Sequence, residues 1–245
     1  MRLFKGLADF RTFREEWRKQ GALGALKTAR EAMRLRLQIA GDRRFDRTYG
    51  VDTCGLTLLT DLSVGGGNIA DCVYYDPTPV RLLQRIFRKL PRELDEYIFV
   101  DFGSGKGRVL LAASRLPFRR IIGVEFAREL HEIATRNIEI YRDPAQRCRD
   151  IQSVCIDARE FEIPPDKCVL FFYRPFSGPV FHRVLERIVA SYRANPRKMY
   201  LVYCCPFSDD PFKSLDFARK IPLPAPLFER LLPGGIGAVL YETRE

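Results

Sequence analysis

Three glycines at alternate positions, Gly103, Gly105 and Gly107, stand between a short apolar run and a helical pattern. The apolar run, Ile98–Val100, has the residue types of a buried strand, and Asp101 follows where that strand would end. Glycines in such a turn let the backbone approach a ligand closely, and the free N–H groups of the next helix favour an anionic part of it. This spacing therefore predicts ligand binding at a strand–helix junction.

The same spacing disfavours two nucleotide motifs. A dinucleotide fingerprint has the form G-x-G-x-x-G, but here the third glycine comes one residue early and Arg108 takes its position. A phosphate-binding loop needs Lys-Ser or Lys-Thr after G-x-x-x-x-G, and neither pair follows such a spacing in this sequence. On the motif alone, a tight strand–helix turn without a ligand stays an alternative.

Length and composition bound the class of protein. The 245 residues fit one α/β domain with an extension, and 46% of them are hydrophobic, which is ample for a core. The seven cysteines form no C-x-x-C pair and the chain has only two histidines, so we expect reduced thiols, no metal and a cytoplasmic location. No apolar run approaches the ~20 residues of a spanning helix, and no secretory signal is evident.

The net charge of +10 is uneven along the chain. Residues 1–48 hold 13 Lys and Arg against 6 Asp and Glu, while the other residues hold 28 against 25. Residues 1–40 also show a helical hydrophobic pattern with breaks at Gly21 and Gly24. Three interpretations compete: a helical cap with solvated basic faces, a helix peripheral to an anionic membrane surface, and an arm for an acidic partner. There is no firm nucleic-acid signal.

Residues 41–72 look irregular, and Ser63–Asn68 is predicted to be a flexible loop. We therefore divide the chain into a basic helical extension with an irregular connecting segment, residues 1–72, and a second domain, residues 73–245. At the start of the second domain Thr78 is the predicted N-cap of a helix whose first residue is Pro79.

Strand and helix patterns alternate after the glycine turn, which is typical of a parallel sheet with covering helices. The predicted strands are Ile121–Glu125, Ile151–Ile156, Cys168–Tyr173 and Lys198–Cys205. Because the carboxyl ends of parallel strands meet at one edge of a sheet, we expect the residues at these ends to face a common ligand. The tail, Phe217–Tyr241, is predicted to form an antiparallel hairpin that closes the sheet.

Taken together, D-x-G-x-G-x-G, G-V-E, D-A and a strand ending in Y-R-P-F resemble class I S-adenosylmethionine (SAM) methyltransferases. The resemblance covers residues 98–205. It implies an α/β fold, a Rossmann-like three-layer sandwich whose mostly parallel seven-stranded sheet has the order 3-2-1-4-5-7-6, preceded here by an N-terminal helical extension. It also implies SAM as the cofactor, S-adenosylhomocysteine as its product, and no metal.

The resemblance implies a set of cofactor contacts. Glu125 would accept the ribose hydroxyls, Asp157 or the backbone of Ala158 would bind the adenine amino group, and the segment Tyr75–Thr78 would close over the methionine end. The full predicted set is Tyr75, Thr78, Asp101, Gly103, Ser104, Gly105, Gly107, Glu125, Asp157, Ala158 and Tyr173.

Two segments are expected to face the methyl acceptor. The segment Tyr75–Pro79 resembles the entrance of seven-strand protein-lysine methyltransferases of the non-SET histone-lysine type. Amine-methylating enzymes often carry Asn/Asp-Pro-Pro-Tyr/Phe after strand four, and this sequence departs from that pattern with Arg174-Pro175-Phe176. Tyr173 and Phe176 are the predicted catalytic wall beside the methyl group, and Arg174 is predicted to bind a substrate carboxylate or phosphate. Packing for Phe176 and simple solvation for Arg174 are the alternatives.

The expected reaction is in-line transfer of the sulfonium methyl to a nitrogen or oxygen acceptor, which is a protein or a small molecule, with a protein lysine as one candidate. An NAD(P)-linked oxidoreductase is the enzyme alternative, disfavoured by the glycine spacing. A catalytically silent SAM-fold protein that binds a partner through its basic N-terminal helices is the third hypothesis.

Overall fold

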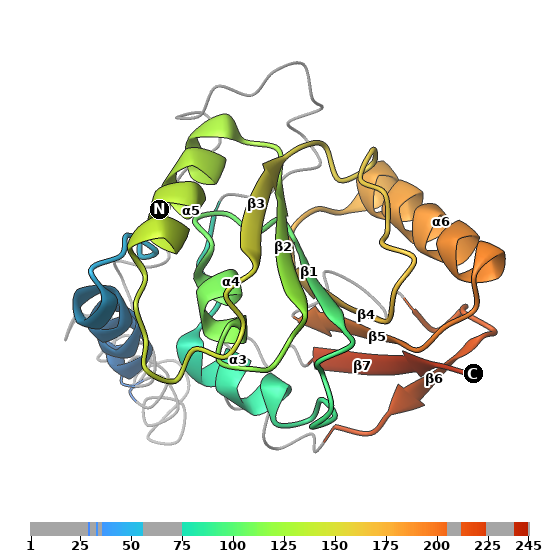
Figure 1. Cartoon of the computed structure of the whole chain (residues 1–245), viewed down its shortest axis with the longest axis horizontal. Coiled ribbons are helices and arrows are strands. Elements are labelled where there is room, and N and C mark those ends of the chain that lie inside the picture. The colour runs from blue at the N-terminus through green and yellow to red at the C-terminus, as the bar shows by residue number, and fades with distance from the viewer. Residues whose placement is uncertain are drawn as a thin grey trace, which may run out of the picture.

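A seven-stranded sheet with the order β3-β2-β1-β4-β5-β7-β6 forms the centre of the molecule (Figure 1). The computed structural model describes residues 36–55, 75–204, 212–223 and 238–244, together with residues 29 and 33. The strand order is the one that the resemblance implied, so the predicted fold class is confirmed.

Five neighbouring strands are parallel, and the last strand of the chain lies in the sheet antiparallel to both of its neighbours. The parallel strands are β1 (Ile98–Phe102), β2 (Arg120–Glu125), β3 (Ile151–Cys155), β4 (Cys168–Tyr173) and β5 (Met199–Cys204). Strand β7 (Ala238–Thr243) is antiparallel to β5 and to β6 (Ala218–Ile221), so β6 runs in the same direction as the parallel strands. The predicted closing hairpin is thereby confirmed, and the carboxyl ends of β1 to β4 lie at one edge of the sheet.

Helices cover both faces of the sheet (Figure 1). The labelled helices are α3 (Val80–Phe87), α4 (Arg108–Ala113), α5 (Arg128–Ile140) and α6 (Gly178–Ala194). Strand β1 supplies both cores because its side chains alternate: Phe99 packs with residues of α3 and α4, and Val100 packs with residues of α6. This sandwich fixes the position of the glycine turn between β1 and α4.

The prediction that residues 41–72 are irregular is wrong for residues 41–49, which belong to a helix that covers residues 36–49. Phe45 and Val51 pack with Leu111 and Tyr141 in a small core of their own. The hydrophobic pattern of this helix is incomplete because Asp42, a polar residue, lies on its buried face. The predicted loop at residues 63–68 lies outside the described residues, and the boundary at residue 72 stays a prediction.

The predicted cap of α3 is also wrong. Helix α3 begins after Pro79, and no side chain of its own segment caps it. The carboxylate of Asp42 instead accepts a hydrogen bond from the N–H of Val80, with Oδ1 and N 3.2 Å apart. A residue 38 positions earlier in the chain thus does what Thr78 was expected to do.

The described residues contain neither a membrane-spanning helix nor a metal-binding cluster. None of the helices in this part of the chain is both long enough and apolar enough to cross a membrane. Within the same residues, no three His, Cys, Asp or Glu side chains are grouped so that they would hold a metal ion.

We predict opposite stability changes for two glycine-to-alanine substitutions. A Cβ atom at Gly123 in β2 would stand 2.6 Å from Ser104 Oγ and 2.7 Å from Leu110 Cδ1, so Gly123→Ala should destabilise the fold by about 1–3 kcal/mol. Gly41 has nothing within 4 Å of that position and lies in a helix, so Gly41→Ala should stabilise by about 0.5–1 kcal/mol. Urea unfolding measures the free energy of unfolding of both variants. A Gly123→Ala variant as stable as the wild type would contradict the close packing of Gly123 against Ser104 and Leu110.

Candidate functional site

Glu125 is hydrogen-bonded to the glycine turn. Glu125 ends β2, and its Oε2 accepts a hydrogen bond from the N–H of Gly105 at 2.8 Å. Its Oε1 accepts from the N–H of Ala127 at 2.9 Å. Because a carboxylate has about four acceptor sites, Glu125 can hold the turn and still bind hydroxyl groups of a ligand.

The three glycines of the turn all have positive φ angles: 75° at Gly103, 53° at Gly105 and 84° at Gly107. A Cβ atom at Gly105 would lie 2.2 Å from the ring of Tyr75, and one at Gly103 would lie 2.5 Å from Pro175 Cβ. The turn therefore needs glycine both for its backbone and because two other segments press against it. These are the predicted entrance segment and the loop after β4.

Two buried carboxylates lie beneath this turn. Asp101 is 2% exposed and Glu125 is 4% exposed. Among the described residues, Asp101 Oδ2 and the buried Ser104 Oγ have no hydrogen-bond partner. Burial, together with the charge of Glu125, raises the pKa of Asp101 well above its usual value. Burial also raises the pKa of Glu125, and its backbone N–H partners oppose that rise. A ligand that brings positive charge or hydrogen-bond donors would satisfy these groups.

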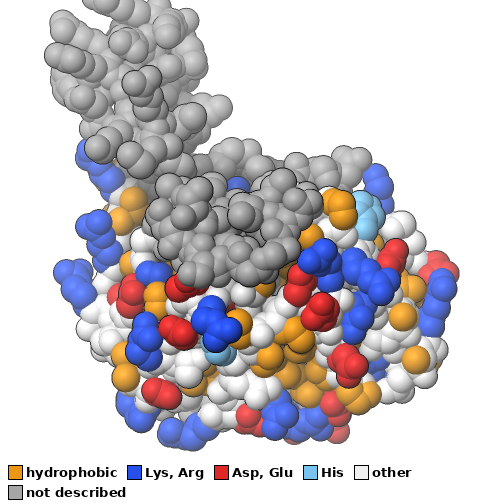
Figure 2. All heavy atoms as spheres, turned by 90° about the horizontal axis from the view of Figure 1, so that it is seen from above, with side chains coloured by type: hydrophobic (Ala, Val, Ile, Leu, Met, Phe, Trp, Pro, Cys, Tyr) orange, Lys and Arg blue, Asp and Glu red, His pale blue; other side chains and the backbone are white. Residues whose placement is uncertain are grey.

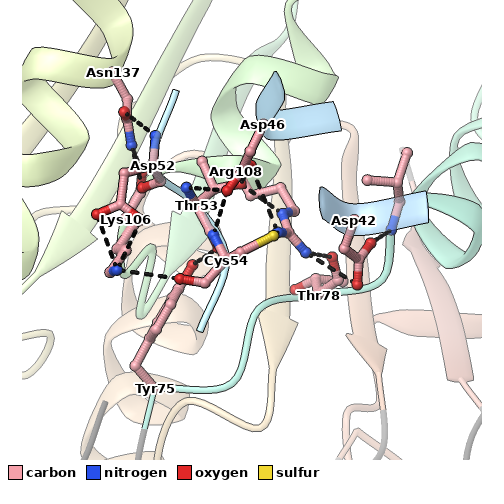
Figure 3. A network of polar contacts seen from close by, with 11 residues as sticks. Asp42, Asp46, Asp52, Thr53, Cys54, Tyr75, Thr78, Lys106, Arg108 and Asn137 are labelled. Carbon is pink, nitrogen blue, oxygen red and sulfur yellow. Dashed lines mark hydrogen bonds and ion pairs between the residues drawn. The ribbon is translucent and has the colours of Figure 1, made fainter. Parts of the chain in front are cut away.

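Arg108, the first residue of α4, is 1% exposed and binds four side chains of the N-terminal part of the chain (Figure 3). It forms ion pairs with Asp42 at 3.3 Å and Asp46 at 3.8 Å. Its Nε donates to Thr53 Oγ1 at 2.8 Å, and its Nη2 lies 3.0 Å from Cys54 Sγ. Asp46 in turn accepts hydrogen bonds from the backbone N–H groups of Thr53 and Cys54, at 2.9 and 2.7 Å.

A second set of contacts ties residues 51–54 to the turn itself. Lys106 Nζ lies 3.1 Å from Asp52 Oδ1, and the Asn137 amide donates to the backbone oxygens of Asp52 and Lys106, at 2.8 and 2.9 Å. The Tyr75 hydroxyl donates to the carbonyl oxygen of Thr53 at 2.8 Å. The ring that presses on Gly105 is therefore positioned by the segment that Arg108 holds (Figure 3).

Sequence reasoning missed Arg108, Asp42, Asp46 and Thr53. The sequence does carry one signal, because Asp42 and Asp46 are four residues apart and so share a helix face. Nothing in the sequence pairs that face with an arginine more than 60 positions later, and only the fold brings them together.

The loop after β4 contains the one non-glycine residue with a positive φ among the described residues, Arg174, at 44°. Its Nη2 lies 3.1 Å from Asp76 Oδ2, and its guanidinium lies over the half-buried Tyr173 ring, 5.6 Å from the centroid. Burial raises the pKa of Asp76 and the charge of Arg174 opposes that rise. A strained backbone of this kind is common at binding sites.

The remaining predicted residues differ in their placement. Phe176 is 5% exposed and packs with Phe172 and Phe181 in the core, so the structure does not bring its ring to the site. Asp157 follows the end of β3, is partly exposed and pairs with Arg159 at 2.6 Å; Ala158, next to it, is half-buried. Thr78 is buried, and its carbonyl oxygen lies 3.5 Å from Arg108 Nη1.

No protein-family model and no curated protein sequence matches this chain. Among solved structures, an RNA methyltransferase from Salinibacter ruber in complex with S-adenosyl-L-homocysteine is 19% identical, aligns over 69% of this chain and 92% of its own, and has a TM-score of 0.41. A SAM-dependent methyltransferase from Leishmania major is 14% identical over 67% of this chain and 71% of its own, with a TM-score of 0.47. Values of this size assign neither a ligand nor a reaction to this chain.

We expect Arg108→Met to destabilise the protein by roughly 3–5 kcal/mol, because it leaves two largely buried carboxylates without their cation. Arg120→Met is the matched control: the Arg120–Asp150 pair is half exposed on both sides, so its loss should cost less than about 1 kcal/mol. Chemical denaturation of the three proteins measures the difference. Similar losses in both variants would show that the buried network contributes little.

Asp101→Asn should change how stability depends on pH. A raised native pKa means that the folded protein holds a proton which the unfolded chain loses near pH ~4, so stability falls as pH rises from that value toward the native pKa. The neutral amide lacks this penalty. The variant should therefore gain stability over the wild type as pH rises from 4 to 8, and this gain should vanish at low pH. Thermal midpoints across the pH range measure it; a constant difference would contradict a raised pKa.

Proposed function

We propose that the chain is a SAM-dependent methyltransferase acting on a nitrogen or oxygen acceptor. The observation that carries the proposal is the pair of buried carboxylates, Asp101 and Glu125, beneath a positive-φ glycine turn at the carboxyl edge of the sheet. A ligand with a cationic amino acid end and a ribose would complement two acids. A dinucleotide would instead bring a pyrophosphate to the turn, beside the Asp101 carboxyl.

We propose a partner among the site residues for each part of SAM. The orphaned oxygens of Asp101 and Ser104 would satisfy the ammonium group, and the remaining lone pairs of Glu125 would accept the ribose hydroxyls. Asp157 and Ala158, which follow β3, are the proposed adenine contacts. When bound, the cofactor supplies an activated methyl group on a sulfonium. The chain itself needs to orient the acceptor and exclude water.

The methyl acceptor is proposed to enter between the segment Tyr75–Pro79 and the loop after β4. The pair Asp76–Arg174 joins the two at 3.1 Å, so a substrate carboxylate or phosphate at Arg174 would compete with Asp76. If the acceptor is a protonated amine, Asp76 is the proposed acceptor of its proton. The ring of Tyr173 is proposed to lie beside the methyl group that is transferred. A protein lysine is the finer proposal, and it rests on the resemblance of Tyr75–Pro79 and of the glycine-turn segment, residues 99–108, to the protein-lysine enzymes.

The first test measures cofactor binding by calorimetry. The wild type should bind S-adenosylhomocysteine, and Glu125→Gln should weaken binding about 10- to 100-fold, because a hydrogen bond to a charged group contributes roughly 1.5–3 kcal/mol. Glu132→Gln, an exposed glutamate on α5, is the matched control and should bind as the wild type does. Stabilisation by NAD and not by SAM would overturn the proposal in favour of an oxidoreductase.

The second part of the test identifies the acceptor. Methyl-tritiated SAM is incubated with the protein and a cell lysate, and the label is then sorted into protein, nucleic acid, lipid and small molecules. Label in lysine of a protein fraction would support the finer proposal. Cofactor affinity with no methyl incorporated would favour the catalytically silent alternative.

A further inference from the structure

We propose that the outward face of the helix at residues 36–49 docks on an anionic membrane surface. This face, called the arginine face below, consists of exposed residues on one side of the helix and of the described residue that precedes it. Its members are Met33, Arg36, Leu37, Ile39, Arg43, Arg44 and Arg47. The proposal is independent of methyl transfer.

The helix has two faces of opposite charge. Asp42 and Asp46 point inward, where the Arg108 guanidinium lies 3.3 and 3.8 Å from their oxygens. The four arginines recur at i, i+7, i+8 and i+11, which is the spacing of a single stripe on a helix. The polar contacts of Asp42 and Asp46 lie on this inward side, with Arg108, Val80 and residues 53–54. The stripe spans about 16 Å at 1.5 Å per residue.

The apolar members of the arginine face distinguish lipid from nucleic acid. Met33 is 55% exposed, Leu37 48% and Ile39 42%. Only one other large apolar side chain in the described part of the chain is comparably exposed, Ile140 at 50%. A phosphate backbone would pair with the arginines and leave these side chains in water. A lipid interface accepts both, since headgroups bind the guanidinium groups and the acyl boundary covers the apolar side chains.

The surface view agrees with this description. Along the left edge of Figure 2, on the side where Figure 1 draws the helix in dark blue, Lys and Arg side chains stand beside hydrophobic ones. The inward face is tied to α4 and α3 through Arg108 and Val80, so a docked helix would carry the whole domain with it.

The test is flotation of the full-length protein with vesicles of phosphatidylcholine alone or with 30% phosphatidylglycerol added. The wild type should bind the anionic vesicles, not the neutral ones, and should dissociate at high salt. The triple variant Arg43→Gln, Arg44→Gln, Arg47→Gln should bind on the order of 100-fold more weakly, since each arginine near such a surface contributes roughly fivefold. Leu37→Gln should give a smaller loss.

The matched control neutralises three exposed basic residues elsewhere, Lys89→Gln, Arg92→Gln and Arg193→Gln, and should retain most of the binding. All these side chains are exposed, so thermal unfolding should show that every variant folds. An equal loss of vesicle binding in both triple variants would show that binding depends only on net charge, and it would overturn the proposal. So would a wild type that ignores the vesicles but binds an RNA oligonucleotide, which would assign the arginine face to a nucleic acid.

Discussion

The buried guanidinium of Arg108 is the constraint on which the arrangement of the site depends. A charge that is 1% exposed must be paired, and its ion-pair partners, Asp42 and Asp46, come from a helix far away in the sequence. Arg108 is also the first residue after the glycine turn. The turn and the N-terminal segment are therefore fixed to each other, since neither can move without exposing or separating buried charges.

This constraint reaches the ligand edge of the sheet through short contacts. Thr53 binds Arg108 with its side chain and Tyr75 with its carbonyl oxygen, and the Tyr75 ring lies on Gly105. The stretch at residues 42–54 thus belongs structurally to the site, although the resemblance that suggested the cofactor does not extend to it. Beneath the turn, Asp101 and Glu125 are two buried acids that lack, among the described residues, a cation such as Arg108. They need positive charge or hydrogen-bond donors from a ligand.

The same N-terminal helix divides its charges between its two faces. Its aspartates pair with Arg108 in the interior. Its arginines face outward, beside apolar side chains that are exposed to water. A helix that only capped the domain could have solvated arginines on its outward face, but it would gain nothing from exposed Leu37 and Ile39 beside them. Its two faces suit contact with the domain on one side and with an anionic surface on the other.

The sequence by itself indicated a parallel sheet with covering helices and the position of the glycine turn, because hydrophobic periodicity and glycine spacing are local properties. The order of the seven strands came from the family resemblance. The bounds of β4 were predicted to the residue, and the other strands of the parallel sheet to within about two residues. The sequence likewise placed Glu125 at a strand end. Whether these residues bind SAM stays a prediction.

Only the tertiary structure decided which side chains complete the site. It buried Phe176 in the core, replaced Thr78 by Asp42 as the cap of α3, and gave Arg108 its partners. Each of these outcomes depends on contacts between segments far apart in the chain. Local patterns report how a segment folds, but the pairing of buried charges is set by the three-dimensional packing that brings them together.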